Sequence, residues 1–207
     1  MESQMTWRNY QNLLPMEGLN KAISALKKGG VVICPTDTVY GFLADASNKK
    51  AVEKIYKIKK RLKSKPLPIF VKDLTMAKGL AEISKEQEKI IKKYWPGKYT
   101  FVLKCKSQNP NLKVKVKNRK LYGVAKDTIA IRIPKHKFLN ELLKKINRPL
   151  VQTSVNISGR EVLRTIEDIK KSFREQKEVL IIDGGNLKKS KPSAIMGLTS
   201  PKLIKLR

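Results

Sequence analysis

The stretch GGVVICPTDTVYG, residues 29–41, joins a pair of glycines to a short apolar segment and then to a cluster of polar side chains. The apolar segment, 31–34, is rich in β-branched residues and stops before Pro35, which indicates a buried strand. Upstream, apolar residues spaced i, i+3, i+4 and i+7 predict a helix over 17–28. The glycine pair ends this helix because glycine readily adopts the left-handed C-cap conformation. A helix followed by a buried strand and a polar turn is typical of a layered α/β protein.

The rest of the chain continues this alternation of helices and strands. Helices are predicted over 49–59, 86–94 and 138–146, and from Thr165, which forms a weak capping box with Asp168. Strands are predicted over 67–71, 99–103, 128–133, 149–153 and 179–182, with short terminal strands at Ile195 and 202–206. Segment 104–126 is polar and basic without helical periodicity, so we expect a long loop or an irregular hairpin there. No domain boundary is visible, and we predict a single domain over 1–207 with its core at about 16–206.

The composition is that of a folded and strongly basic protein. A hydrophobic fraction of 41% over 207 residues can bury a core, which excludes a disordered or fibrous protein. Lysine and arginine number 46 against 17 aspartates and glutamates, so the formal net charge is +29. This charge has two interpretations: attraction to polyanions such as RNA, nucleotides or an anionic membrane, or a lysine-rich solvated surface. Because lysines occur in every segment, both interpretations stay open.

Several classes of protein are excluded by what the sequence lacks. Two cysteines and one histidine provide neither a disulfide framework nor a zinc cluster, so we expect a reducing, cytoplasmic location and no protein-bound metal. No apolar run of about 18 residues predicts a membrane span, and the N-terminal segment has no apolar core of a secretory signal. Phosphate-loop, dinucleotide-binding and nucleophile-elbow motifs do not occur.

Three polar segments follow predicted strands or helices, at the kind of position where ligands bind in open α/β sheets. They are 35–41, 59–66 and 153–159. Alternate residues of an extended segment point the same way, so Ser154, Asn156 and Ser158 are expected to line one wall. The arginine and lysines of 59–66 suit phosphate oxygens, although the same charges are typical of a solvated helix end.

Three single residues are interpreted separately. Arg132 lies inside a predicted strand, where an inward-pointing charge needs a partner, either a ligand carboxylate or an internal aspartate or glutamate. His136 is expected to help start the following helix and not to bind metal. Cys34 is expected to be a small core residue, because no histidine or asparagine partner supports cysteine catalysis.

Seven short motifs occur along the chain in a fixed order. They are PTDTVYG at 35–41, KxR at 59–61 with KPL at 65–67, WPGxxTF at 95–101, RxP at 132–134, TSxNxSG at 153–159, DGG at 183–185 and PSxI at 192–195. Together they resemble the YrdC/Sua5 (TsaC) family, the threonylcarbamoyl-AMP synthases. The match ends near Arg207, so the chain is similar to the short, single-domain form and not to the longer Sua5 type with an extra C-terminal domain.

The resemblance implies a fold and a reaction. The expected fold is a twisted α/β sheet flanked by helices, with a concave, positively charged groove. The expected enzyme is a nucleotidyltransferase that makes threonylcarbamoyl-adenylate and pyrophosphate from L-threonine, bicarbonate and ATP. Proteins of a partner transferase complex then move the threonylcarbamoyl group to adenosine 37 of tRNAs that read ANN codons, which makes t6A. Magnesium is expected on the ATP and not in a carboxylate site of the protein. The sequence leaves open whether tRNA itself contacts this chain.

The resemblance also assigns site residues. The family's nucleotide-site tetrad, expected to bind ATP and support catalysis, matches Lys59, Arg61, Ser154 and Asn156. Lys65 and Thr128 fall at positions near the nucleotide. The positions that hold threonine match Thr38, Arg132, Gln152 and Ser193, and Arg132 is expected to take the α-carboxylate.

The chain departs from the family pattern at four positions. Leu62 and Lys98 replace prolines, Val155 replaces a small residue, and Ala194 replaces a hydroxyl residue. The bulk of Val155 is expected to affect the strand between two ligand residues. Near the C-terminus, Lys205 and Arg207 both compete for the role of the basic residue that approaches the nucleotide.

Two other functions are weighed against the synthase. A basic RNA-binding protein of the same fold, without adenylation activity, is favoured by the net charge. A carbamoyl-transfer module related to hydrogenase maturation proteins ranks last, because the acylphosphatase and zinc-finger segments of those proteins do not occur here.

Overall fold

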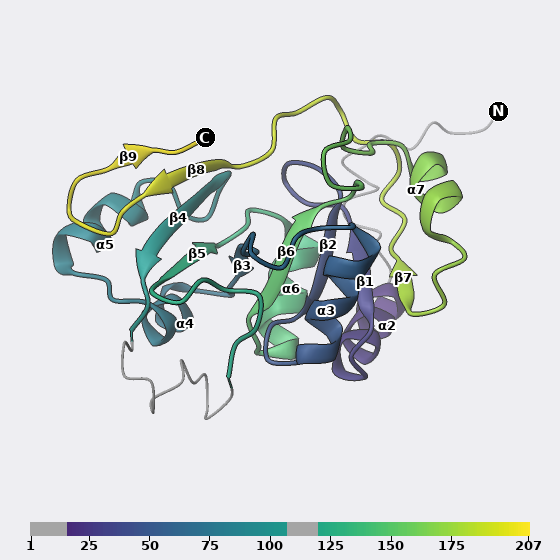
Figure 1. Ribbon diagram of the computed structural model, residues 1–207, viewed down its shortest axis with the longest axis horizontal. Helices are drawn as coiled ribbons and strands as arrows, with labels where there is room; N and C mark the ends of the chain where they lie inside the picture. The colour runs from purple at the N-terminus through teal and green to yellow at the C-terminus, as the bar shows by residue number, and fades with distance from the viewer. Residues whose placement is uncertain (1–15, 107–119) are drawn as a thin grey trace.

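The computed structural model describes residues 16–106 and 120–207, and one mixed sheet of nine strands runs through them (Figure 1). The strands lie in the order β7-β1-β2-β6-β3-β5-β4-β8-β9. Their bounds are β1 Val31–Cys34, β2 Gly41–Asp45, β3 Ile69–Phe70, β4 Tyr99–Lys104, β5 Thr128–Arg132, β6 Leu150–Ser154, β7 Val179–Ile181, β8 Ala194–Gly197 and β9 Ile204–Lys205. The helices are α2 Met16–Lys27, α3 Lys49–Ile58, α4 Leu74–Leu80, α5 Lys85–Lys92, α6 Lys137–Ile146 and α7 Ile166–Phe173.

Pairing along the sheet is mixed. Strand β1 is parallel to β7, β3 to β5 and β4 to β8, and the other neighbours are antiparallel. The fold class expected from the sequence, a twisted α/β sheet flanked by helices, is therefore confirmed.

Both faces of the sheet are covered, which explains the continuous apolar run in β1. Val31 and Ile33 pack into one core cluster, whereas Val32 and Cys34 pack into the other. Helices α2 and α6 lie side by side over the second cluster (Figure 1), and α3, α4, α5 and α7 contribute to the first. A strand buried on both sides has no polar face, so its sequence does not alternate. Cys34 is a buried core residue, as predicted.

The helix ends follow the predicted signals. Helix α2 ends at Lys27, and Gly29 has a φ of +78°, the left-handed conformation that the glycine pair predicted. Thr165 caps α7, because its hydroxyl accepts a hydrogen bond from the backbone N–H of Asp168 at 3.1 Å. His136 occupies the N-cap position of α6, as expected, although its side chain makes no capping bond there.

The sequence interpretation was incomplete in three places. Strand β2 and helix α4 were not predicted, and the strand expected over 67–71 is confined to Ile69–Phe70. Within segment 104–126, Lys104 belongs to β4, Cys105 forms an isolated bridge with Ala81, and 120–126 has neither helix nor strand. The remainder of that predicted loop, 107–119, lies outside the described residues. None of the described helices is long and apolar enough to cross a membrane.

Candidate functional site

A cavity of about 730 Å³ opens at the ends of β1, β5 and β6 and before β8. All the site residues assigned from the sequence line it: Thr38, Lys59, Arg61, Lys65, Thr128, Arg132, Gln152, Ser154, Asn156 and Ser193. Ser158 also lines it, as expected from its alternation with Ser154 and Asn156. The lining includes six basic residues and no aspartate or glutamate, so the cavity suits an anionic ligand.

Strand pairing brings the three polar segments together. Gly41 of β2 is the register partner of Ser154 of β6, so the turn before β2 lies beside the segment after β6. The backbone N–H of Val155 donates to the carbonyl of Tyr40 at 3.0 Å. The N–H of Ser158 donates to the carbonyl of Lys59 at 2.8 Å, which joins the end of α3 to the same place.

Lys59 organises the segment that follows β6. Its side chain is buried, and Nζ donates to the carbonyls of Ser154 at 2.6 Å and Asn156 at 2.9 Å and to Oδ1 of Asn156 at 2.7 Å. Burial, with a smaller effect from the charge of Arg61, lowers the pKa of Lys59 to about 7. An ammonium group has three N–H donors, and all three are engaged.

Ser154 and Asn156 are fixed by the same network. The Ser154 hydroxyl donates to Oδ1 of Asn156 at 2.9 Å, and Nδ2 of Asn156 donates to the carbonyl of Arg160 at 2.6 Å. Val155 is completely buried and belongs to the core cluster, so its bulk is accommodated on the side away from the cavity.

Arg61 is held by its own loop. Its Nε donates to the carbonyl of Lys65 at 3.1 Å and one terminal nitrogen, Nη2, to the carbonyl of Pro66 at 3.0 Å. Among the described residues, the other terminal nitrogen has no hydrogen-bond partner. The guanidinium is therefore oriented by the backbone and keeps donors for a ligand.

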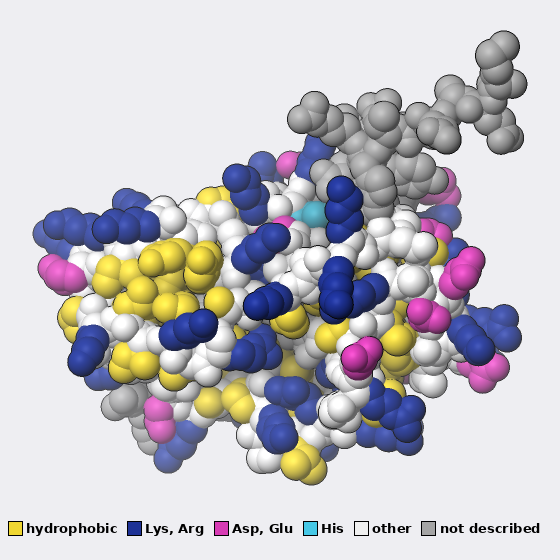
Figure 2. Space-filling model, turned by 90° about the horizontal axis from the view of Figure 1, so that it is seen from above, with side chains coloured by type: hydrophobic (Ala, Val, Ile, Leu, Met, Phe, Trp, Pro, Cys, Tyr) yellow, Lys and Arg dark blue, Asp and Glu magenta, His cyan; other side chains and the backbone are white. Residues whose placement is uncertain are grey.

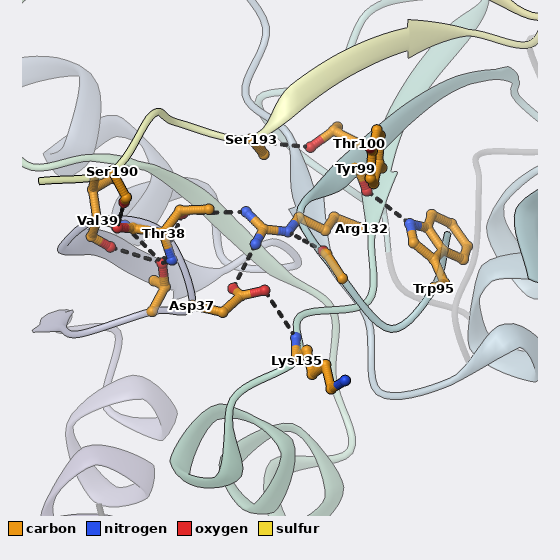
Figure 3. A network of polar contacts seen from close by, with 12 residues as sticks. Asp37, Thr38, Val39, Trp95, Tyr99, Thr100, Arg132, Lys135, Ser190 and Ser193 are labelled. Atoms are coloured by element: carbon orange, nitrogen blue, oxygen red, sulfur yellow. Dashed lines mark hydrogen bonds and ion pairs between the residues drawn. The ribbon is translucent and has the colours of Figure 1, made fainter. Parts of the chain in front are cut away.

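Arg132 has an internal partner, one of the two alternatives left open by the sequence. Its guanidinium is 1% exposed, and Nη2 pairs with Oδ1 of Asp37 at 2.5 Å (Figure 3). Nε donates to the carbonyl of Gly97 at 2.8 Å, and Nη1 lies 3.5 Å from the hydroxyl of Thr38. Burial lowers the pKa of Arg132, and Asp37 counteracts this shift. Sequence reasoning gave Asp37 no role in the site, although it lies inside the first polar segment.

A segment before β8 closes the side of the cavity on which Thr38 lies. The Ser193 hydroxyl lies 3.1 Å from that of Thr100, and the Ser190 hydroxyl donates to the carbonyl of Thr38 (Figure 3). Earlier in the same segment, the carbonyl of Gly185 accepts a hydrogen bond from the Tyr40 hydroxyl at 2.7 Å. This hydroxyl also accepts from the N–H of the preceding glycine at 2.9 Å. Burial raises the pKa of Tyr40 to about 12, so this phenol stays protonated.

Of the two competing C-terminal basic residues, Arg207 reaches the cavity. It lines the cavity and donates from Nη2 to the carbonyl of Ser193 at 3.1 Å, whereas Lys205 does not line it. Within the described residues, no group of three or more histidine, cysteine, aspartate or glutamate side chains could hold a metal ion.

Comparisons with known proteins agree on one family. The Sua5/YciO/YrdC family model, described as "Telomere recombination", matches residues 24–207. A protein from Methanocaldococcus jannaschii, whose name carries threonylcarbamoyl-AMP synthase as a provisional assignment, is 40% identical over 195 residues, 92% of this chain and 87% of the relative. The threonylcarbamoyl-AMP synthase of Pyrococcus abyssi is 34% identical over 86% of this chain and 50% of its own length.

Solved structures give the same result. The structure of P. abyssi Sua5 complexed with L-threonine is similar with a TM-score of 0.78 and 30% identity, over 91% of this chain. This chain spans 53% of that structure, so it is similar to about half of the longer protein. The structure of Escherichia coli YciO is similar with a TM-score of 0.74 and 27% identity, over 92% of this chain and 88% of YciO.

Proposed function

Because the chain belongs to the Sua5/YciO/YrdC family, we propose that it is an L-threonylcarbamoyladenylate synthase. The reaction joins L-threonine, bicarbonate and ATP into threonylcarbamoyl-AMP and releases pyrophosphate, so the enzyme is a nucleotidyltransferase. Relatives named threonylcarbamoyl-AMP synthase, and the relative whose structure holds L-threonine, support this assignment.

One observation carries the proposal. The basic residues suited to a triphosphate and the residues suited to an amino acid line the same cavity. Lys59, Arg61 and Lys65 stand on one side, where Ser154 and Asn156 add polar oxygens and nitrogens. Thr38, Arg132 and Ser193 lie together on the side closed by the segment before β8. A site that must join an amino acid to a nucleotide needs this arrangement.

The proposed mechanism depends on positioning and charge neutralisation. The threonine amine condenses with bicarbonate, with loss of one water molecule, to form a carbamate. A carbamate oxygen then attacks the α-phosphorus of ATP, and the bond from the α-phosphorus to the leaving pyrophosphate breaks. Arg61 and Lys65 neutralise charge on the phosphates, and the bonded Ser154 and Asn156 orient the nucleotide. Because no acidic side chain lines the cavity, magnesium would be coordinated by the triphosphate and not by a carboxylate cage.

Arg132 is suited to receive the threonine α-carboxylate. A guanidinium has five N–H donors, and the contacts with Asp37, Gly97 and Thr38 engage three of them. Two donors are left for a carboxylate, and the buried environment strengthens each contact. Thr38 and Gln152 would complete the amino acid site.

We further propose that the product serves t6A formation in the cytoplasm. A mixed anhydride of a carbamate with AMP is reactive and short-lived, so a transferase complex must consume it close to where it forms. That complex, with tRNA as final acceptor, is the partner class that this reaction requires.

The test is pyrophosphate release by the purified chain with ATP, magnesium and bicarbonate, with and without L-threonine. We expect threonine-dependent release that Arg61→Ala reduces at least about ten-fold, since a hydrogen bond to a charged group contributes roughly 1.5–3 kcal/mol. Arg174→Ala, at the exposed end of α7, is the matched control and should retain full activity. Absence of release with any amino acid would reject the synthase.

The net charge of +29 supports a second candidate, an RNA-binding protein of the same fold without adenylation. Affinity for RNA should then fall steeply and linearly with the logarithm of the salt concentration. An RNA titration at several salt concentrations, done beside the pyrophosphate assay, distinguishes the two functions.

A further inference from the structure

Strands β4, β8 and β9 form one end of the sheet (Figure 1). A second cavity, of about 650 Å³, is lined by residues of these three strands and of the segments beside them. It shares Pro192, Ser193 and Arg207 with the first cavity, so these three residues form a wall common to both. Of the rest of its lining, only Gly97 takes part in the first site, through its carbonyl, which accepts a hydrogen bond from Arg132. We call it the β8 cavity.

The β8 cavity is surrounded by basic side chains from several elements. They are Lys93, Lys98, Lys191, Lys205 and Arg207. No aspartate or glutamate side chain lines the cavity, and among the described residues none of these five cations forms an ion pair with a carboxylate side chain. Over the whole face seen from above in Figure 2, basic side chains outnumber acidic ones.

Lysines elsewhere in the chain pair with glutamate side chains, unlike the five cations of the β8 cavity. Lys92, next to Lys93 in the sequence, pairs with Glu88 at 2.7 Å. A third cavity, along α3, is also rich in lysine, but Glu53 lines it and pairs with Lys63 at 3.7 Å. Five like charges around one cavity with no acidic side chain in its lining repel one another, and a bound anion would reduce that repulsion.

The lining indicates what kind of anion fits. A monocarboxylate could neutralise one of the five cations, whereas a polyphosphate carries several charges in a compact group. An RNA backbone spreads its charge along an extended track, but here the cations surround a single concavity. Tyr94 and Tyr99, whose ring centroids are 4.6 Å apart, add an aromatic wall on which a nucleobase could also pack.

We propose that the β8 cavity is a second anion site, which binds the polyphosphate group of a small ligand. The group comes either from inorganic pyrophosphate or tripolyphosphate, or from the phosphate tail of a nucleotide. Through Arg207 and Ser193 the occupied site would contact the wall of the first cavity. The proposal does not rest on the proposed synthase activity, because it concerns binding alone.

The test is calorimetric titration of the full chain with inorganic tripolyphosphate, pyrophosphate and ATP at low salt. We expect two binding events for tripolyphosphate. Lys93→Glu with Lys98→Glu should weaken one event roughly a hundred-fold, about ten-fold for each lysine. Arg61→Ala should weaken only the other event. If the β8 cavity binds tripolyphosphate and ATP with equal affinity, its ligand is an inorganic polyphosphate. If it binds ATP more tightly, its ligand is the phosphate tail of a nucleotide.

The control is Lys27→Glu with Lys28→Glu, two exposed lysines that also stand at the end of a helix. It should leave both events unchanged. Lys191→Glu is a second variant in case the first folds poorly, and thermal unfolding monitors folding of each. A single event in the native chain, equal losses in the variant and its control, or binding of single-stranded RNA but not of tripolyphosphate would overturn the proposal.

Discussion

Replacing Asp37 with asparagine removes the carboxylate that pairs with the buried guanidinium of Arg132. Arg132 is 1% exposed and Asp37 8% exposed, and the atoms Nη2 and Oδ1 are 2.5 Å apart. With the two charge centres about 4 Å apart and an effective dielectric constant of about 20, their attraction is about 4 kcal/mol. Breaking a buried pair by removing one partner costs about 3–5 kcal/mol, a range that includes this value. We therefore expect the free energy of unfolding of Asp37→Asn to fall by about 3–5 kcal/mol.

Urea unfolding followed by tryptophan fluorescence measures this loss. L-Threonine at a fixed concentration should stabilise Asp37→Asn more than the native chain, because its α-carboxylate supplies the missing negative charge. The control is Glu141→Gln, which breaks an exposed pair with Lys144 at 3.3 Å and should change stability by less than about 1 kcal/mol. If Asp37→Asn unfolds within about 1 kcal/mol of the native chain, Asp37 does not compensate the charge of Arg132.

Three further outcomes are expected. Burial lowers the pKa of Lys59 from 10.5 to about 7, so between these values the unfolded chain binds more protons than the folded one and stability from this group rises with pH. The free energy of unfolding, measured with urea at pH 7 and 9, should rise less with pH in Lys59→Met than in the native chain. An equal rise in both chains would contradict the lowered pKa of Lys59. Tyr40→Phe removes two hydrogen bonds to segment 184–190 and should destabilise the chain by about 1–2 kcal/mol, with faster amide hydrogen exchange in that segment. Unaltered exchange would mean that the phenol does not hold the segment. Arg207→Ala should raise the KM for ATP roughly ten-fold and Lys205→Ala less than about two-fold. The reverse order would assign the nucleotide-side role to Lys205.

The sequence was sufficient to predict which residues line the candidate site, because many of them lie immediately beside strand ends. The polar turn at 36–40 follows β1 and precedes β2, and Ser154 is the last residue of β6. Once Gly41 pairs with Ser154, both polar segments must face the same cavity. The position of the polar segments beside strand ends, together with the pairing of β2 with β6, therefore brings most of the candidate site residues to one cavity.

The missed elements lacked the local signals on which sequence interpretation depends. Strand β2, GFLAD, is buried at all five residues, so it shows no alternation that would separate it from the motif before it. Helix α4 has only seven residues and contains Gly79, which weakens helix propensity. The pairing of Asp37 with Arg132 joins residues 95 positions apart and requires the order of strands from β1 to β5, which periodicity does not reveal.

The hydrogen bonds within the cavity distinguish side chains that keep donors for a ligand from side chains whose donors are all engaged. When Lys59 is protonated, its three N–H groups are all engaged by Ser154 and Asn156, so a phosphate could reach Nζ only by displacing one of these partners. Arg61 is held through Nε and one terminal nitrogen and keeps its other terminal nitrogen for a ligand. We therefore expect Arg61 to be the direct phosphate contact and Lys59 to act by fixing the polar segment after β6. A site built in this way can accelerate a reaction without a nucleophile of its own, because its donors are oriented before substrates arrive.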